Sequence, residues 1–363
     1  MWLVNINFIW SKIEINYLIE WKKKKISNKV LKIFFLGCGK IFSKHISAVN
    51  NLKNKFVKIG VYKNKIKFTK HVYGKKYLEQ IKKSDIVTIL TPSGLHIQNI
   101  NLCLKYKKYI IVEKPICLKL KELDQLISIP IYNKKIFPIF QNRLNHNVKN
   151  FKEKIDKKKL GKIFLISGRM YLNRNKNYYQ GDKWRGTWKI DGGVATNQAI
   201  HILDLVCWIF GDIKSVFARS SSFKKHIEAE DTIIINLKFK SGALGNLEFT
   251  TACTHNNYEN SITALGDKGL SKIYGNKFEK LDYQVKNHKV QNLKISKINQ
   301  DLHLESYKLI ASVLDGKDRP PELAGLKDCR KSLELLTAIY ASIENQKEIA
   351  LPLKNYPKIM LGN

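Results

Sequence analysis

Acidic residues and arginines are scarce in this chain, and lysine dominates its charge. The 363 residues contain 65 Lys and Arg against 30 Asp and Glu, which gives a formal net charge of +35. Seven of the basic residues are arginines, and the lysines are scattered from end to end. A nucleic-acid-binding protein usually concentrates its basic residues on one face. The scattered pattern therefore argues against a nucleic-acid partner and favours a general attraction to anionic substrates.

Long apolar runs and closely spaced cysteines are also missing. No window reaches about eighteen uninterrupted apolar residues, so we expect no membrane span. The six cysteines form no CxxC pair, and several of them lie in apolar runs. This pattern argues against a zinc site or a disulfide framework, so we predict no metal and a reducing, cytoplasmic location.

The first thirty residues do not fit a secretory signal. Met1–Trp10 is apolar, but Lys12, Glu14 and Glu20 interrupt the pattern, and a basic start and a small-residue cleavage site are missing. We interpret residues 1–30 as an N-terminal extension, or as the result of a translation start placed too early.

The length exceeds what one hydrophobic core usually supports, so we expect two domains. Over residues 31–145, short β-rich runs alternate with helical segments, which is typical of βαβ units and a parallel sheet. Over residues 146–363, short strands follow one another with turns between them, which favours an antiparallel sheet and two closing helices. The expected strands are 30–36, 56–62, 86–90, 109–112, 136–140, 162–169, 216–220, 232–238, 244–250 and 261–265. The expected helices are 40–50, 95–105, 118–127, 148–158, 301–315 and 328–346.

A glycine turn follows the first expected strand and opens the first helix. The glycines of such a turn allow the backbone to approach a dinucleotide pyrophosphate at a helix N-terminus. The third glycine of the usual fingerprint is replaced by Phe42, but that glycine serves helix–strand packing rather than phosphate contact. The expected cofactor contacts in this turn are Gly37, Cys38, Gly39, Lys40 and Ile41.

The end of the second strand departs from the fingerprint in a different way. An acidic residue is expected there to bind the ribose hydroxyls, but the chain has Lys63. A carboxylate would repel a 2′-phosphate and a lysine would not, so Lys63 favours NADP or a relaxed choice between NAD and NADP. A surface lysine in a lysine-rich chain is the alternative.

The third and fourth strands end in further candidates. Small hydroxyl residues and a glycine follow the third strand, and we expect Thr91, Pro92, Ser93 and His96 to contact the cofactor. Glu113-Lys114-Pro115 ends the fourth strand, and we expect Glu113 and Lys114 to contact the cofactor as well. Pro115 holds Lys114 extended, and a lysine at this crevice can polarise or deprotonate a hydroxyl while hydride leaves the same carbon.

The most informative stretch runs from Trp184 to His201. If its apolar end is one helix, Asn197 and His201 lie four residues apart on one face, which suits proton transfer on a polar ligand. Trp184 and Arg185 are expected to reach the cofactor from the second domain. The alternative is that the two side chains pack together in the core of that domain.

Together these residues resemble the Gfo/Idh/MocA oxidoreductases over about residues 31–354. The resemblance rests on the glycine turn with His45, on the 91–96 turn, on Glu113–Pro115 and on the 184–201 stretch. It implies an α/β protein with an N-terminal Rossmann domain, built on a parallel sheet, and a C-terminal α+β domain. The mostly antiparallel sheet of the second domain would cover the nicotinamide and mediate a homo-oligomer, either a dimer or a tetramer.

The 184–201 stretch is similar to the nucleotide-sugar branch of that family. This resemblance implies a nucleotide-sugar substrate, with oxidation of a ring hydroxyl, C3 in the first place, of a UDP-linked N-acetylated sugar or sugar acid in surface polysaccharide biosynthesis. Lys114 and His201 take the family's catalytic positions, and Asn197 stands where many relatives carry aspartate. An asparagine cannot act as a base, so it would orient the sugar and leave the proton to His201 or Lys114. Lys114 and His201, both as cations, would suit an anionic UDP-uronate.

Several readings stay open at this stage. A free polyol or sugar such as inositol is an alternative substrate, and a cofactor-binding relative without catalysis is a further possibility. His303 lines the site or is a solvated helix residue, and Asp204 either orients His201 or is a surface carboxylate.

Overall fold

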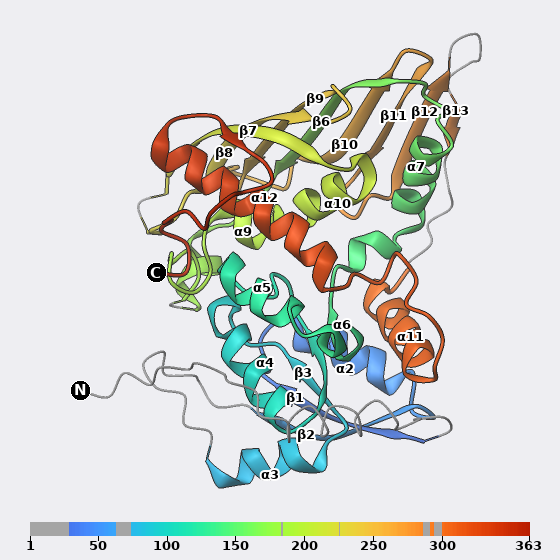
Figure 1. Ribbon diagram of the computed structural model, residues 1–363, viewed down its shortest axis with the longest axis vertical. Coiled ribbons are helices and arrows are strands. Elements are labelled where there is room, and N and C mark those ends of the chain that lie inside the picture. Colours follow the sequence, from blue (N-terminus) through green and yellow to red (C-terminus); the bar gives the residue numbers. More distant parts are fainter. Residues whose placement is uncertain (1–28, 63–73, 183, 225, 286–290, 294–299) are drawn as a thin grey trace.

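The computed structural model describes residues 29–62, 74–182, 184–224, 226–285, 291–293 and 300–363. Two sheets form its framework, and helices fill the space between them (Figure 1). Lys63 and most of the predicted N-terminal extension lie outside the described residues. In the described part of the chain, no helix combines the length and apolarity that a membrane crossing needs.

The N-terminal sheet has five parallel strands in the order β2-β1-β3-β4-β5. Its strands are β1 (Leu31–Leu36), β2 (Phe56–Tyr62), β3 (Ile86–Ile89), β4 (Tyr109–Val112) and β5 (Ile136–Pro138). The helices around it are α2 (Phe42–Asn50), α3 (Lys75–Lys83), α4 (His96–Lys105), α5 (Leu120–Ile127) and α6 (Pro130–Lys135). Alternate residues of β1 join different cores: Ile33 and Phe35 belong to one, and Phe34 and Leu36 to the other. This period of two shows that both faces of the sheet are covered.

The second sheet has nine strands in the order β13-β12-β11-β10-β6-β9-β8-β7-β14. Its β6 and β9 pair in parallel, and the other pairs are antiparallel. The first strands are β6 (Ile163–Tyr171), β7 (Ile213–Ser221), β8 (Thr232–Phe239), β9 (Leu244–Thr250) and β10 (Glu259–Gly266). The sequence pattern did not predict the other four strands. They are β11 (Gly269–Tyr274), β12 (Lys280–Val285), β13 (Gln291–Leu293) and β14 (Ile349–Ala350). The predicted fold class is confirmed: a parallel sheet is followed by a mostly antiparallel one.

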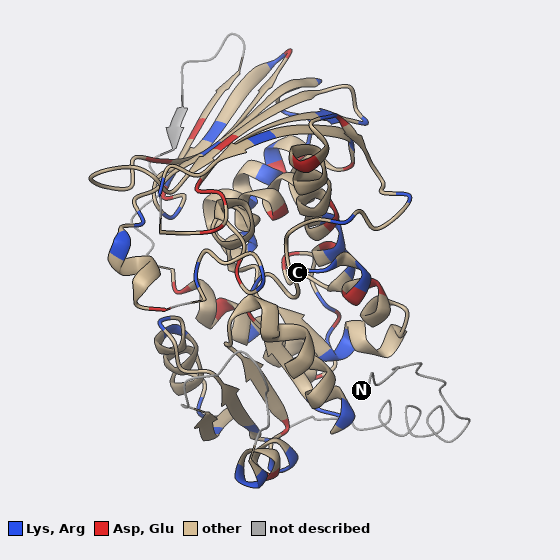
Figure 2. Cartoon of the chain, turned by 90° about the vertical axis from the view of Figure 1, so that its left-hand side faces the viewer, with Lys and Arg blue, Asp and Glu red and all other residues tan. Residues whose placement is uncertain are grey.

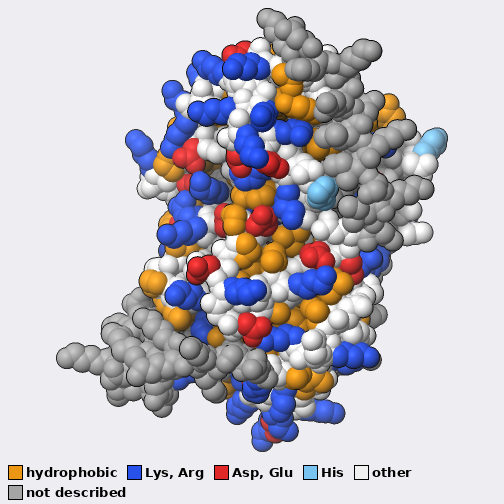
Figure 3. Space-filling model, turned by 90° about the vertical axis from the view of Figure 1, so that its right-hand side faces the viewer, with side chains coloured by type: hydrophobic (Ala, Val, Ile, Leu, Met, Phe, Trp, Pro, Cys, Tyr) orange, Lys and Arg blue, Asp and Glu red, His pale blue; other side chains and the backbone are white. Residues whose placement is uncertain are grey.

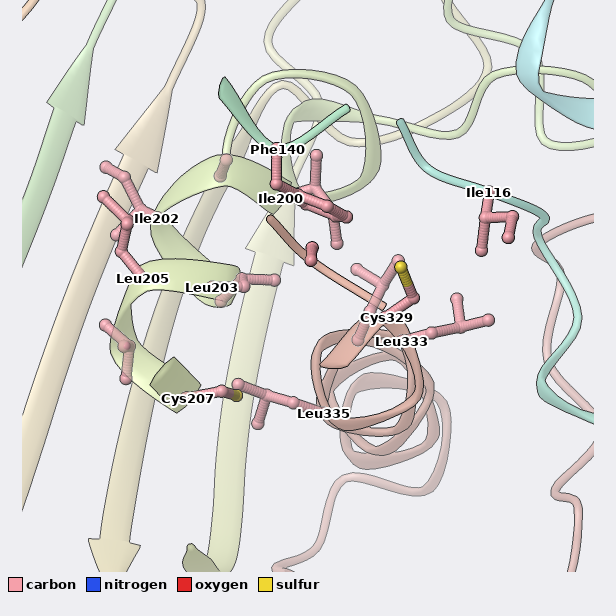
Figure 4. Close-up of a cluster of buried hydrophobic side chains, with 14 of the residues drawn as sticks. Ile116, Phe140, Ile200, Ile202, Leu203, Leu205, Cys207, Cys329, Leu333 and Leu335 are labelled. Atoms are coloured by element: carbon pink, nitrogen blue, oxygen red, sulfur yellow. The ribbon is translucent and has the colours of Figure 1, made fainter. Parts of the chain in front are cut away.

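Two helices join the sheets into one core. α10 (Ile200–Phe210) and α12 (Leu326–Asn345) lie between the sheets (Figure 1). Apolar side chains of both helices meet Ile116 and Phe140 of the N-terminal half in one cluster (Figure 4). The remaining helices of the C-terminal half are α7 (His146–Asp156), α8 (Lys176–Gln180), α9 (Val194–Asn197) and α11 (Leu302–Leu314). Short 3-10 turns lie at Ser93–Leu95 and Gln141–Leu144.

The chain returns to the N-terminal sheet near its end. Tyr307 and Ile310 of α11 join Ile33 and Phe35 of β1 in one buried cluster. Residues 302–314 therefore pack on the first sheet although they follow β13 of the second sheet in the sequence. The division at residue 145 stays a prediction.

One expectation about a helix was wrong, and three helices were not predicted. The segment 194–201 is not one helix: the amide of Ala199 donates to the carbonyl of Val194 at 2.8 Å, which ends α9, and α10 begins at Ile200. The sequence pattern also did not predict α3, α6 and α8. The helix α3 is rich in lysine and buries one residue, Ile81.

The charged residues of the described chain are distributed over both halves of the molecule (Figure 2). On the face drawn in Figure 3, Asp and Glu lie among the Lys and Arg side chains, with hydrophobic side chains between them. This distribution agrees with the scattered lysines of the sequence.

Candidate active site

The glycine turn occupies the carboxyl end of β1, where the strand order reverses. Gly37 has φ +108°, and a Cβ there would lie 2.6 Å from the carbonyl oxygen of Leu90. A side chain is thus excluded by both conformation and space. Around Gly39 there is open space, and residues 38–40 are exposed ahead of α2. This arrangement fits a phosphate group at a helix N-terminus.

The missing third glycine has a visible replacement. The rings of Phe35 and Phe42 pack edge to face, with 5.3 Å between their centroids. Phe42 therefore packs α2 against β1 through an aromatic contact, and the substitution leaves the exposed turn unchanged.

The 91–96 turn connects the two halves of the molecule. The amide of Gly94 donates to the carbonyl of Ile190 at 2.7 Å, and a Cβ on Gly94 would lie 2.8 Å from the carbonyl oxygen of Lys189. The ring nitrogens of His96 lie 2.7 Å from the carbonyl oxygens of Thr91 and Pro115. Thr91, Ser93 and His96 are buried, so this turn positions the 184–193 segment beside the cofactor crevice. Direct contact of Thr91, Pro92, Ser93 and His96 with the cofactor stays a prediction.

A cavity of about 850 Å³ lies between the glycine turn, the second sheet and α10. Its polar lining consists of amides and basic groups. Nine asparagines line it, and among the described residues no Asp or Glu does. The lining asparagines are Asn142, Asn173, Asn175, Asn177, Asn197, Asn256, Asn257, Asn260 and Asn276. The basic and histidine side chains are Lys40, Lys114, Arg174, His201 and His255.

All three predicted catalytic residues line this cavity: Lys114, Asn197 and His201. The ammonium group of Lys114 donates to the backbone carbonyl of Asn197 at 2.5 Å. Burial lowers the pKa of Lys114, and the nearby carboxylates of Glu113 and Asp191 oppose that change. The structure therefore brings together a partly desolvated amine, an amide and an imidazole, although Asn197 and His201 belong to different helices.

His201 is neutral, which corrects the expectation of a second cation. Burial, followed by the charge of Lys114, lowers the pKa of His201 to about 3. Its Nδ1 is buried and has no hydrogen-bond partner among the described residues. At neutral pH, His201 can accept or donate a hydrogen bond but carries no charge.

Asn197 is held by a carboxylate that sequence reasoning missed. Its Nδ2 donates to Oδ1 of Asp191 at 2.5 Å, and the amide of Gly186 donates to Oδ2 at 2.9 Å. Asp191 is 2% exposed, and burial raises its pKa to about 6. Nothing in the sequence spacing pairs residues 191 and 197, because a turn brings them together.

Glu113 points toward two histidines, His45 of α2 and His303 of α11. Its Oε1 lies 2.9 Å from Nε2 of His45 and 3.6 Å from Nε2 of His303. Nδ1 of His45 lies 3.1 Å from the hydroxyl of Tyr307, so α2, β4 and α11 share one buried polar cluster. These three side chains have the composition of a metal site, but His45 and Glu113 are already hydrogen-bonded to each other, and we interpret the cluster as the polar contact that holds α11. His303 therefore neither lines the cavity nor lies in solvent. Contact of Glu113 with the cofactor stays a prediction.

Trp184 and Arg185 form a stacked group at the edge of the cavity. The guanidinium of Arg185 lies 4.4 Å from the ring centroid of Trp184 and 4.6 Å from that of Tyr178. Tyr178 lines the cavity, and the ammonium of Lys40 lies 5.3 Å from its ring centroid. Trp184 and Arg185 thus support Tyr178 opposite the glycine turn, and their own contact with the cofactor stays a prediction.

Both readings of Asp204 were wrong. The carboxylate is 1% exposed and accepts two hydrogen bonds from Arg143, at 2.7 and 2.8 Å. Arg143 also lies 3.3 Å from a carboxylate oxygen of Asp328. Asp204 therefore pairs with a buried arginine that joins α10 to α12 and does not orient His201.

Several cavity residues went unnoticed in the sequence. Arg174, Tyr178 and three of the asparagines come from one polar run that follows β6 and extends into α8, and His255 comes from the loop before β10. The alternation of asparagine through residues 173–177 was the available signal.

Two family profiles match the chain. The profile described as "Oxidoreductase family, NAD-binding Rossmann fold" matches residues 31–138, and "GFO/IDH/MocA C-terminal domain" matches residues 148–271. Among curated relatives, the myo-inositol 2-dehydrogenase of Thermotoga maritima is 28% identical over 196 residues. That match covers 51% of this chain and 55% of the relative, so the chain spans about half the length of the curated protein.

Two solved structures resemble nearly the whole chain. The WlbA dehydrogenases of Bordetella pertussis and Chromobacterium violaceum, each in complex with NADH and UDP-GlcNAcA, superpose with a TM-score of 0.80 and are 25% and 27% identical. Each covers 91% of this chain, and the chain covers 100% and 99% of theirs. An inositol dehydrogenase homolog of Azotobacter vinelandii, at 16% identity and a TM-score of 0.75, shares the fold.

Proposed function

Because the chain belongs to the Gfo/Idh/MocA oxidoreductase family, we propose that it is an NAD- or NADP-dependent dehydrogenase of a nucleotide-linked sugar. Its reaction would be oxidation of a ring hydroxyl of a UDP-linked N-acetylated sugar or sugar acid, and C3 is the position that we propose. The WlbA structures, which hold UDP-GlcNAcA and match 91% of the chain, support this substrate class, and with it a place in surface polysaccharide biosynthesis.

The composition of the cavity carries the proposal. An ionised UDP-sugar acid has several negative charges and many hydroxyl and carbonyl groups. The described lining offers the cations Lys40, Lys114 and Arg174 to the negative charges. It also offers nine asparagine amides, which can both donate and accept hydrogen bonds. Since no carboxylate lines the described cavity, nothing in its wall repels such a substrate.

The reaction chemistry follows from the state of Lys114 and His201. When bound, NAD or NADP supplies the acceptor for the hydride that leaves the sugar carbon. Burial brings the pKa of Lys114 down toward neutral pH, which favours Lys114 as the group that takes the hydroxyl proton. His201 is neutral and suits a hydrogen bond to the same oxygen. Asn197 orients the sugar through its amide.

The test is a substrate panel with the purified protein. We expect reduction of NAD or NADP, followed at 340 nm, with UDP-GlcNAcA or UDP-GlcNAc and not with free sugars. Turnover of inositol or glucose without turnover of any UDP-sugar would move the protein to another branch of the family.

A second candidate is dehydrogenation of a free polyol such as inositol. The relative from Thermotoga maritima, 28% identical over 196 residues, favours it. The cavity argues for the larger substrate, because inositol is uncharged and would offer no anionic group to Lys40 and Arg174. In the panel, a kcat/KM for inositol above that for every UDP-sugar would establish this alternative.

We further infer that the protein works as a homo-oligomer in the cytoplasm. A row of leucines crosses the outer face of the large sheet, where Leu165 and Leu244 are neighbours and are 38% and 56% exposed. Helices cover the other face of this sheet (Figure 1), so a second copy of the chain is the occupant that we propose for the leucine row. All six cysteines are free thiols, which fits a reducing compartment.

A further inference from the structure

A buried carboxylate lies directly behind the cavity wall. Asp191 is 2% exposed and is not part of the lining. It accepts hydrogen bonds from Nδ2 of Asn197 at 2.5 Å and from the amide of Gly186 at 2.9 Å. Asn197 in turn lines the cavity, and its backbone carbonyl accepts the hydrogen bond from Lys114 at 2.5 Å. A continuous chain of contacts thus leads from Asp191 to the amine at the reaction centre.

The chemistry of this pair determines which way the Asn197 amide faces. A carboxylate can only accept hydrogen bonds, so the amide nitrogen must lie toward Asp191. The amide oxygen is then turned away from Asp191 and is available as an acceptor. A ligand group beside Asn197 must donate a hydrogen bond to be satisfied, as a sugar hydroxyl does.

The charge of Asp191 acts on the same centre. Asp191 is buried at low dielectric, where its attraction for the Lys114 ammonium is screened less than in water. It opposes the effect of burial on the pKa of Lys114. The charged groups that act on Lys114 are Glu113 and Asp191, which raise its pKa, and Arg185 and Arg174, which lower it.

We propose that Asp191 is a positioning residue, which fixes the Asn197 amide so that the site presents a hydrogen-bond acceptor to a hydroxyl of the substrate and holds Lys114 beside it. The proposal rests on the proposed function, because the Asn197 amide oxygen needs a sugar hydroxyl that donates a hydrogen bond to it. Asp191 itself touches neither substrate nor cofactor. It acts through Asn197 and through its charge.

The first test is the isosteric Asp191→Asn variant. An amide at position 191 can still accept from Gly186, but it removes the charge and one of the acceptors facing Asn197. We expect kcat for the UDP-sugar to fall about 10²-fold, because a small misplacement of the reacting groups has an effect of that size. Affinity for NADH, measured by fluorescence, and the thermal midpoint should stay within the wild-type range. The wild-type acidic limb near pH 6 should flatten, since Asp191 titrates there.

The second test exchanges the two side chains. In the double variant Asp191→Asn with Asn197→Asp, the pair is restored with the donor and acceptor reversed. We expect kcat of the double variant to be at least tenfold higher than kcat of the single Asn197→Asp variant, in which two carboxylates face each other. A general structural role for Asp191 would not produce such recovery.

A third measurement works without any sugar. In protein labelled with 15N-asparagine, the side-chain amide signal of Asn197, identified by its loss in Asn197→Asp, should shift with pH around 6 in the wild type. In Asp191→Asn it should not shift. If the signal ignores pH and the Asp191→Asn variant keeps wild-type kcat, KM and pH profile, the positioning role is wrong. If the signal behaves as expected while no sugar is oxidised, the proposed function fails and the Asp191–Asn197 pair stands.

Discussion

Burial lowers the pKa of both Lys114 and His201, but the two shifts have opposite consequences for proton transfer at neutral pH. It lowers the pKa of Lys114 from 10.5 toward neutral pH, and it lowers the pKa of His201 from 6.5 to about 3, away from neutral pH. A general base works best when its pKa lies near the operating pH. The two candidates that the sequence left equal therefore have different pKa shifts in the folded protein, and Lys114 is the base that we propose.

Substitution of each residue should expose this difference. We expect Lys114→Met to lower kcat by about 10³-fold or more, and His201→Asn to lower it by about 10- to 10²-fold, because the second change removes a hydrogen bond and not the proton acceptor. The pH profile of His201→Asn should keep the wild-type shape between pH 5 and 8, since His201 does not titrate in that range. Steady-state kinetics across that range measures both effects. A lost limb in His201→Asn, with full activity in Lys114→Met, would reverse the assignment.

Among the elements, α9 depends most on its surroundings. It has four residues, too few for a helix to persist alone. Glu230 supplies its first bonds: the amide of Val194 donates to the Glu230 carbonyl at 2.9 Å, and the amide of Ala195 donates to Oε1 at 3.0 Å. The hydroxyl of Tyr340 donates to the same oxygen at 3.0 Å. Since Asn197 ends this helix, Glu230 also helps to place the cavity wall.

The ionisation of Glu230 predicts a pH-dependent stability. Burial raises the pKa of Glu230 from 4.5 to about 7. Its folded pKa lies above the unfolded one, so its contribution is fully present below pH 4.5 and is lost as pH rises through 7. We expect the thermal midpoint of the wild type to fall by several degrees between pH 5.5 and 8 relative to Glu230→Gln, which keeps the accepting oxygen but cannot ionise.

Differential scanning calorimetry at these two pH values is the measurement. Glu228→Gln, a nearby carboxylate substitution, is the control and should follow the wild type. Parallel behaviour of Glu230→Gln and wild type would show that Glu230 does not titrate in this window.

At the scale of the whole molecule, the large sheet separates two environments. Its inner face packs on α10 and α12 (Figure 1), and its outer face carries a leucine row across four strands. The members of this row are Leu270, Leu265, Leu165 and Leu244, each opposite the next in register. Exposed aliphatic side chains in a contiguous row are typical of an interface.

Charges placed in the leucine row should dissociate the proposed oligomer. We expect Leu165→Lys with Leu244→Lys to convert a dimer or tetramer into monomers, because a copy of the same face would bring lysines together. Light scattering coupled to size exclusion measures the mass. Met360→Lys, 47% exposed near the C-terminus and away from the sheet, is the matched control. A monomeric wild type, or a double variant of unchanged mass, would rule out this interface.

Local patterns in the sequence were enough to predict the fold and to name three candidate catalytic residues that line one cavity. Alternating strands and helices, together with the glycine turn, predicted the parallel sheet and the antiparallel one after it, because each depends on residues close in sequence. Lys114, Asn197 and His201 were named on motifs of the same local kind. The expected packing role of position 42 is seen in the contact of Phe42 with Phe35 of the adjacent strand.

The states and partners of those groups depend on contacts between distant segments. The charge of His201 depends on its burial and on the nearby charge of Lys114, and no spacing in the chain reports either. Asp191 meets Asn197 through a turn, Asp204 meets Arg143 across 61 residues, and the amide-rich cavity combines loops that the sequence keeps apart. The amino-acid order thus determined which chemical groups the protein has and on which elements they lie. The three-dimensional packing decided their charge and orientation, because desolvation and hydrogen bonding are set by neighbours in space.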